Sequence, residues 1–300
     1  MSFKGAKMDK KVALQLSNTL PLEDYAKAMA DAGFKYYAIS FNDYKPLVQD
    51  DYLDYINNIK KIFLDCGLKC VQTHAPYYNL LVGAEVRDID IEKAIFRSIE
   101  ATKILGGEVL AVHPRSFIIE NQPRETAVDR EKSLKENVIS FKPLALECEK
   151  QGVLLGIENL MKYPNEYPYF YSWMIEDHIE LINALDSDSV CAVWDFGHAN
   201  LVEVEHAERI NLLGNKIKAT HVHNNAGWND EHLPPFLPPK GAYYAKRIID
   251  WDKVLKALKN TNYSGYLTLE VVFNDKCPLN GYLSYLFESV LQLYDTLEGE

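Results

Sequence analysis

The chain of 300 residues has few cysteines, no long apolar run and no excess of positive charge. Its five cysteines form an odd-numbered set without C-x-x-C spacing, which is typical of free thiols in a reducing, cytoplasmic setting rather than of a disulfide framework. No apolar stretch approaches the length of a membrane span, and the first residues lack the apolar core of a signal peptide. We therefore expect a cytoplasmic protein without a membrane partner.

Acidic residues outnumber basic ones, with 43 Asp and Glu against 32 Lys and Arg and a formal net charge of -11. This balance works against attraction to phosphate backbones and anionic lipid, although it leaves room for a local basic groove. No long basic run is present, so a nucleic-acid partner is disfavoured. The apolar fraction of 47% and the charged fraction of 25% are those of an ordinary globular protein with a substantial core.

Short apolar segments alternate with segments of helical periodicity along the whole chain. The expected strands cover residues 11–17, 36–41, 70–77, 108–114, 153–160, 190–198, 218–225 and 265–273. The expected helices cover residues 21–34, 51–68, 91–107, 125–151, 172–185, 204–213, 250–260 and 280–296. Each of the eight strand segments is thus followed by a helical segment.

This alternation favours a closed (β/α)8 barrel, a TIM barrel of the α/β class, formed as a single domain by residues 1–300. A doubly wound open sheet is the competing architecture, but the first strand-to-helix connection, SNTLPLEDY, lacks the glycine-rich phosphate fingerprint of such folds. No linker or domain boundary is visible. The connection at 226–249 is expected to be functional, because loops of that length in compact domains usually are.

Side chains that commonly bind metals or transfer protons stand at the ends of six consecutive strand segments. They are His74, His113, Glu158, Asp195 followed by His198, His221 with His223, and Glu270. The active site of a (β/α)8 barrel lies at the carboxyl ends of its strands, so we expect these side chains to converge. A lone histidine such as His74 has an alternative explanation as a hydrogen-bonded structural residue.

The three carboxylates of this set each end an apolar strand, where an unpaired carboxylate is costly to bury. Such groups are usually paired, hydrogen-bonded or bound to a cation. His221 and His223 are two residues apart and therefore face the same side of a strand. A neutral imidazole and three carboxylates suit Mn²⁺, Mg²⁺, Co²⁺ or Zn²⁺, with the ligands Glu158, Asp195, His223 and Glu270. The alternative is a polar plug in the barrel mouth.

Other histidines and the tyrosines are set apart from this group. His178 and His206 fall in helical segments and are expected on the surface or on a helix face. The tyrosines at 77–79, 167–173 and 243–244 either line a pocket for a polar substrate or pack in the ordinary half-buried way.

The motifs HAPY, VHP, IEN, WDFGH, HVHNN and LEVVF follow one another at successive strand ends. In this order they resemble the xylose-isomerase-like barrels grouped as sugar phosphate isomerases and epimerases, and the resemblance spans essentially the whole chain. That group includes keto-sugar 3-epimerases, hydroxypyruvate isomerase, inosose dehydratase, dehydroshikimate dehydratase and endonuclease IV. The resemblance implies a divalent metal held by Glu158, Asp195, His223 and Glu270.

It also implies an isomerase or epimerase of a small sugar, sugar phosphate or polyol-like substrate, and leaves a homo-oligomer open. Glu158 and Glu270 would face each other across the metal, one removing the proton beside the substrate carbonyl and the other returning one through an enediolate. His198 matches a family position that contacts substrate oxygens. The other expected substrate contacts are His74, His113, His221 and, as an anion contact, Arg115.

The same resemblance carries an alternative from the hydrolase class, a multinuclear zinc phosphodiesterase like endonuclease IV. Nine residues match the metal ligands of those enzymes in type and order: His74, His113, Glu158, Asp195, His198, His223, Asp230, His232 and Glu270. Asp230 and His232 are thus candidates for an additional metal site. Asp230 follows His223 sooner than in those nucleases, however, and Asn229 stands where keto-sugar 3-epimerases carry an arginine. A barrel that binds metal and ligand without turnover is a third alternative.

Overall fold

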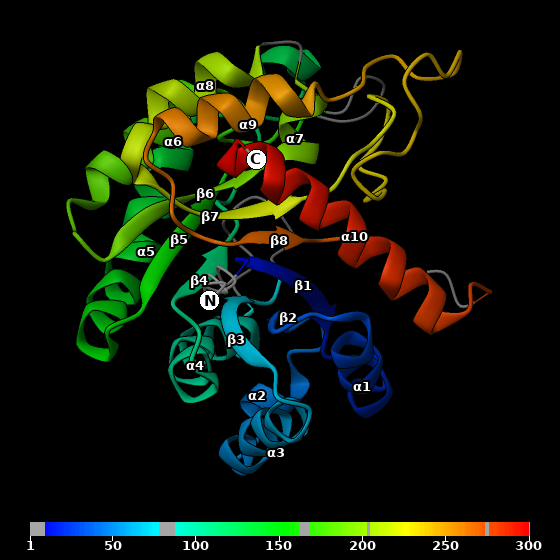
Figure 1. Ribbon diagram of the computed structural model, residues 1–300. Coiled ribbons are helices and arrows are strands. Elements are labelled where there is room, and N and C mark those ends of the chain that lie inside the picture. Colours follow the sequence, from blue (N-terminus) through cyan, green and yellow to red (C-terminus); the bar gives the residue numbers. More distant parts are fainter. Residues whose placement is uncertain (1–9, 78–87, 163–168, 203–204, 274–275, 300) are drawn as a thin grey trace.

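Eight parallel strands close into a barrel in the order β1 to β8, and β1 pairs with β8 to complete the ring (Figure 1). The computed structural model describes residues 10–77, 88–162, 169–202, 205–273 and 276–299. The strands are β1 (Val12–Ser17), β2 (Tyr36–Ser40), β3 (Lys69–His74), β4 (Val109–Val112), β5 (Leu154–Glu158), β6 (Val190–Asp195), β7 (Ile217–Val222) and β8 (Leu267–Leu269). The predicted (β/α)8 barrel is confirmed, and the doubly wound sheet is excluded because the ring is closed.

Helices surround the barrel and bury their apolar sides against it (Figure 1). The main helices are α1 (Leu22–Ala32), α3 (Tyr52–Asp65), α4 (Ile89–Leu105), α5 (Arg130–Gln151), α6 (Ile175–Leu185), α8 (His206–Leu213), α9 (Trp251–Asn260) and α10 (Leu279–Glu298). Their order matches the expected helical segments. Four short elements were not expected, namely α2 (Lys45–Val48), α7 (Phe196–Asn200) and the 3-10 turns η1 (Arg124–Thr126) and η2 (Gly214–Lys216).

The helix positions follow from the spacing of apolar residues. In α3, for example, Ile56, Ile59 and Phe63 are buried, and they lie on one side of the helix because they are three and four residues apart. Burying each such side chain contributes about 1.5–3 kcal/mol. Terminal signals agree with this pattern, since the Asp88 side chain caps the start of α4 and Gly106 ends it with a positive φ of 93°.

The strand expected at 190–198 is shorter in the structure and ends at Asp195. The cause is the Asp195 side chain, which accepts a hydrogen bond from the backbone N–H of His198 at 2.6 Å and thereby caps α7. The chain turns into α7 directly at the end of β6. His198 consequently lies at the barrel mouth as part of a helix rather than on a strand.

Gly156 of β5 offers a test of barrel packing. A Cβ atom at this position would lie 2.5 Å from Cγ2 of Val193 and 2.8 Å from Cγ1 of Val109, which belong to the two neighbouring strands. We expect Gly156→Ala to lower the free energy of unfolding by about 1–3 kcal/mol through overpacking, measured by urea titration.

Gly281 of α10 provides the matched control. No heavy atom lies within 4 Å of the Cβ position there, and alanine is the better helix former. Gly281→Ala should leave the free energy of unfolding unchanged or raise it. Equal urea midpoints for the two variants would contradict the packing described for β5.

Candidate functional site

The carboxyl ends of the strands bring histidines and carboxylates together in three groups of ligand atoms, each group lying within 4.8 Å. The first group is His74, His113 and Glu158. The second group is Glu158, Asp195, His221 and Glu270. The third group is His198, His223, Asp230 and His232. Since Glu158 belongs to both the first and the second group, the groups form one continuous polar centre in the barrel mouth.

The second group is arranged around Nδ1 of His221 on β7. This atom lies 3.0 Å from Oε2 of Glu270, 3.2 Å from Oε1 of Glu158 and 3.7 Å from Oδ2 of Asp195. The three carboxylates come from β5, the end of β6 and the residue after β8. They are almost completely withdrawn from solvent, and the most accessible of them, Glu270, exposes 11% of its side chain. Three buried negative charges therefore face one imidazole nitrogen.

In the first group, two histidines face the other oxygen of Glu158. Nε2 of His74 lies 3.1 Å from Oε2 of Glu158, and Nε2 of His113 lies 3.2 Å from the same oxygen. Nδ1–H of His74 donates to the carbonyl of Ala75 at 2.7 Å. The lone pair of His74 is therefore on Nε2, and it is directed at Glu158 and His113.

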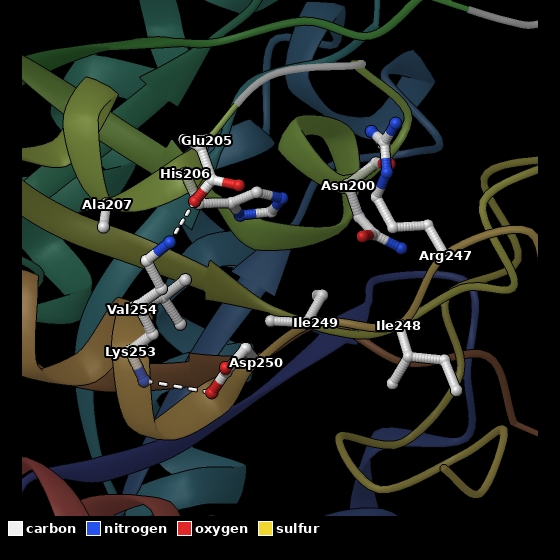
Figure 2. A pocket seen from close by; sticks show the side chains of 10 residues that line it. All are labelled: Asn200, Glu205, His206, Ala207, Arg247, Ile248, Ile249, Asp250, Lys253 and Val254. Carbon is white, nitrogen blue, oxygen red and sulfur yellow. Dashed lines mark hydrogen bonds and ion pairs between the residues drawn. The ribbon is translucent and has the colours of Figure 1, made fainter. Parts of the chain in front are cut away.

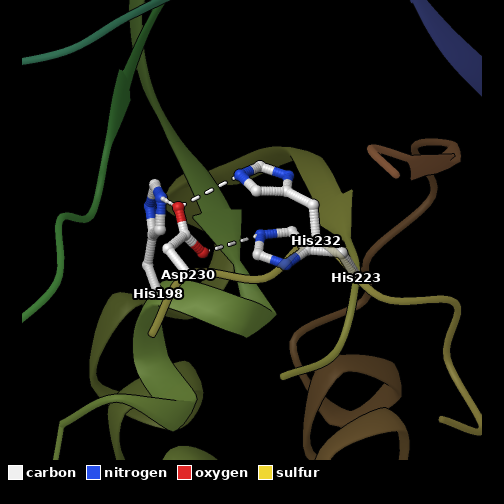
Figure 3. A group of neighbouring side chains, drawn as sticks. All are labelled: His198, His223, Asp230 and His232. Atoms are coloured by element: carbon white, nitrogen blue, oxygen red, sulfur yellow. Dashed lines mark hydrogen bonds and ion pairs between the residues drawn. The ribbon is translucent and has the colours of Figure 1, made fainter. Parts of the chain in front are cut away.

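Figure 3 shows the third group, with Asp230 between His198 on one side and the rings of His223 and His232 on the other. Oδ2 of Asp230 lies 3.0 Å from Nε2 of His232 and 3.3 Å from Nε2 of His198. The rings of His223 and His232 stack with centroids 4.0 Å apart. His232 has a positive φ of 47°, a backbone conformation that non-glycine residues seldom adopt and that recurs at functional sites.

The donor arrangement fits divalent cations. Besides His74, both His198 and His232 donate Nδ1–H to a backbone carbonyl, those of Asn159 at 2.9 Å and Glu270 at 3.0 Å. This fixes the ring and leaves the opposite nitrogen facing a carboxylate, as in metal-binding histidines. Such an arrangement of lone pairs is repulsive unless a cation or a proton lies between them.

Two further observations support this fit. Nδ1 of His221 and Oδ1 of Asp230 are buried, and neither makes a hydrogen bond with any residue that the structure describes. Burial alone would lower the pKa of His232, but the Asp230 carboxylate outweighs burial and raises that pKa to about 10. The carboxylates thus attract positive charge strongly. Imidazole nitrogen and carboxylate oxygen are the usual ligands of Zn²⁺, Mn²⁺ and Co²⁺.

The structure exchanges two histidines relative to the expected ligand set. His221, not His223, joins Glu158, Asp195 and Glu270, because His221 pairs in register with Asp195 across β6 and β7. His223 lies beyond the end of β7 and turns toward the third group, with only Asp195 of the three carboxylates in contact, at 3.0 Å from Nε2. Its ring occupies the space beside Gly197, where a Cβ atom would be 1.9 Å from Cε1.

Arg115, His178 and His206 are also placed differently from expectation. Arg115 lies outside the three groups, and its Nη2 is 3.3 Å from Oε1 of Glu92 on α4. His178 is buried rather than exposed, and Nε2–H donates to the carbonyl of Ile157 at 2.9 Å. His206 is likewise buried. The two histidines fall on helix sides that face the barrel, which periodicity alone did not reveal.

Sequence reasoning missed several residues that hold the site in place. Gln15 of β1 donates Nε2–H to Oε1 of Glu270 at 2.7 Å, and the side-chain amide of Gln72 contacts Nε2 of His221. The hydroxyl of Tyr77 lies 3.4 Å from the same oxygen of Glu270. A signal for the two glutamines was present, because each interrupts an otherwise apolar strand with an uncharged polar residue.

A cavity of about 320 Å³ opens beside the second group. Its polar lining includes Gln15, Ser40, Asn42, Tyr77 and Glu270, and its apolar lining includes Val271 and Phe273. Hydroxyl and amide groups can both donate and accept hydrogen bonds, so they match the hydroxyl groups of a polyol. The cavity therefore gives a small polar molecule access to Glu270.

None of the helices in the described ranges combines the length and the apolar character that crossing a membrane requires.

Comparison with known proteins agrees with the barrel. D-psicose 3-epimerase of Enterocloster bolteae is 26% identical over 167 residues, which are 56% of this chain and 47% of that enzyme. Protein MJ1311 of Methanocaldococcus jannaschii is 27% identical over 205 residues, which are 67% of this chain and 64% of that protein. The chain therefore matches about half to two thirds of the length of these curated relatives.

The crystal structure of 3-keto-D-glucoside 4-epimerase YcjR from E. coli superposes with a TM-score of 0.70 at 20% identity, over 95% of this chain and 99% of that one. At this identity the likeness shows the shared fold. A family model described as xylose isomerase-like TIM barrel matches residues 26–282. The chain accordingly belongs to the xylose isomerase-like TIM barrel family.

Proposed function

We propose that the protein is a divalent-metal-dependent isomerase or epimerase of a small sugar or polyol-like carbonyl compound. The observation that carries the proposal is the second group, in which Glu158 and Glu270 approach the same nitrogen of His221 beside a cavity lined with hydroxyl and amide groups. Support also comes from relatives that are named as sugar epimerases, including D-psicose 3-epimerase and 3-keto-D-glucoside 4-epimerase. The substrate is accordingly a carbohydrate.

In this proposal, Glu158, Asp195, His221 and Glu270 hold the metal. When bound, a divalent cation supplies a Lewis acid that stabilises negative charge on the substrate carbonyl oxygen. Gln72 holds the His221 ring through Nε2, which keeps Nδ1 directed at the three carboxylates. Asn159 fixes the backbone of Asp195, since its Oδ1 accepts from the Asp195 N–H at 2.8 Å.

Proton transfer is assigned to Glu158 and Glu270, one as the base that takes the proton beside the carbonyl and the other as the acid that returns one. Glu270 lines the cavity and is oriented by Gln15, so it reaches a substrate directly. Burial raises the pKa of Glu270, but the neighbouring His221 outweighs burial and holds the pKa below its usual range. Glu270 is consequently ionised and able to accept a proton.

Phosphate-ester hydrolysis by a multinuclear centre is the second candidate function. The specific observation in its favour is that the first and third groups adjoin the second and have ligand sets of their own. More than one bound cation would suit the attack of water on a phosphate ester. The net charge of -11 disfavours a nucleic-acid substrate, so a small phosphorylated molecule is the better match for this candidate.

Metal content separates the two candidates. We expect the purified protein to hold about one equivalent of Mn, Co or Mg per chain and to lose thermal stability when a chelator removes it, because an ion that binds only the folded state stabilises that state. Elemental analysis and thermal unfolding measure both effects. Two or three zinc ions per chain would contradict the isomerase proposal and favour hydrolysis.

Asp195→Asn tests the ligand set without disturbing the fold, because asparagine is as good an N-cap as aspartate for α7. We expect this variant to bind Mn²⁺ about tenfold more weakly or worse, in line with the loss of a charged ligand. Asp129→Asn is the matched control, since Asp129 caps α5 in the same way but lies outside the three groups. Equal Mn²⁺ affinity in both variants would remove Asp195 from the ligand set.

Proton transfer can be measured directly as incorporation of solvent deuterium into ketoses such as D-psicose or D-tagatose. We expect exchange at the carbon beside the carbonyl, and a decrease of about 10²–10⁴-fold in Glu158→Gln and in Glu270→Gln, because each variant loses its acid/base group. Glu92→Gln is the control, since Glu92 pairs with Arg115 away from the groups. Undiminished exchange in Glu158→Gln would refute the role proposed for this residue.

A further inference from the structure

A second cavity, of about 410 Å³, lies where the connections after β6 and β7 meet the start of α8 and α9. Figure 2 shows its lining, to which Asn200, His206, Arg247 and Lys253 contribute. None of the described residues that line it belongs to the three groups of the barrel mouth. The cavity is thus a separate place for a ligand, with polar groups from three different segments of the chain.

His206, the first residue of α8, is the most unusual part of this lining. Only 8% of its surface is exposed, yet both ring nitrogens lack a hydrogen-bond partner among the described residues. Burial, Arg247 and Arg209 together lower the pKa of His206 to about 3. The imidazole is therefore neutral and brings one N–H donor and one lone pair to the cavity wall, both unused.

Asn200, at the end of α7, has the same property. It is 1% exposed, and Nδ2–H donates to Oδ1 of Asn225 at 2.9 Å, which leaves Oδ1 of Asn200 without a donor in the described part of the chain. Buried polar groups are nearly always hydrogen-bonded, and those that are not call for a ligand or an ordered water. Two such side chains on one cavity wall indicate a molecule that carries hydroxyl groups.

The charge of the lining is positive once internal pairs are counted. Glu205 pairs with Lys253, and Asp250 accepts a hydrogen bond from the backbone N–H of Lys253 at 3.2 Å as the cap of α9. Both acids are thereby compensated. Arg247 remains, and Nη1 of its guanidinium is anchored on two backbone carbonyls of the segment after α7. The start of α8, which has no side-chain cap, adds the positive end of a helix dipole.

We propose that this cavity binds a small hydroxyl-bearing anion of the sugar-phosphate class, with the phosphate against Arg247 and the start of α8 and the hydroxyls on His206 and Asn200. The shape of the site agrees with this ligand, because Ile248, Ile249 and Val254 supply an apolar wall for carbon atoms. A fixed guanidinium is well suited to phosphate oxygens.

Binding here would also be transmitted toward the barrel mouth. The backbone N–H of Arg247 donates to the carbonyl of Ala226 at 3.2 Å, and Asn225, the partner of Asn200, accepts from the N–H of Gly227 at 3.0 Å. The segment 224–227 leads directly to Asp230 of the third group. A ligand that contacts Asn200 and Arg247 therefore stabilises the segment from which Asp230 projects.

Calorimetric titration of the purified protein with D-ribose 5-phosphate, D-ribose and inorganic phosphate tests the proposal. We expect D-ribose 5-phosphate to bind more tightly than either of the others, because it alone offers both the anion and the hydroxyls. His206→Phe should weaken its binding about tenfold or more through the loss of hydrogen bonds, and Arg247→Gln likewise. Glu270→Gln should leave it unchanged, which distinguishes this cavity from the metal groups.

His206→Phe is the deciding variant, because the Arg247 side chain also anchors backbone. Phenylalanine keeps the ring packed against Trp194 and removes two unpartnered nitrogens, so without ligand its melting temperature should equal or exceed that of the wild type. D-ribose 5-phosphate should raise the melting temperature of the wild type and of Glu270→Gln, but not that of His206→Phe. Equal affinity of wild type and His206→Phe, or binding lost only in Glu270→Gln, would overturn the proposal.

Discussion

The barrel mouth depends on the buried carboxylate of Glu158. Its Oε2 faces His74 and His113, while its Oε1 lies 3.2 Å from His198 and from His221. A carboxylate that is 1% exposed is tolerated only where positive charge or hydrogen-bond donors compensate it, and these histidines come from four different strand ends. The compensation therefore requires a closed ring with the strands in register. Fold and candidate chemistry are two results of the same convergence.

Much of this was predictable because strand and helix periodicities differ. Apolar runs separated by helical spacing indicated each barrel strand, and a carboxylate at the end of an apolar run marked Glu158, Asp195 and Glu270. The choice between His221 and His223 could not be predicted from periodicity, which places both on the same side of a strand. It depends on where the hydrogen bonds of β7 stop, and the strand ends between them.

Long-range contacts account for the other differences between sequence and structure. Helical spacing suggested a surface or helix-face position for His178 and His206, but what packs on that side is decided by strands and loops far away in sequence. The same holds for Arg115, whose guanidinium turns toward Glu92 on a neighbouring helix. Gln15 and Gln72 differ, since a polar residue within a buried strand is visible in the sequence and signals a partner inside the barrel.

Asp195 divides its two oxygens between two tasks. Oδ1 caps α7, whereas Oδ2 lies 3.0 Å from His223 and 3.7 Å from His221. Selection on folding and selection on chemistry therefore act on the same side chain with different tolerances. Descendants of this protein that kept the barrel but lost metal chemistry would be free to replace the carboxylate only by another good cap, such as asparagine or serine. The residue found at this position thus records whether a lineage retained the reaction or only the scaffold.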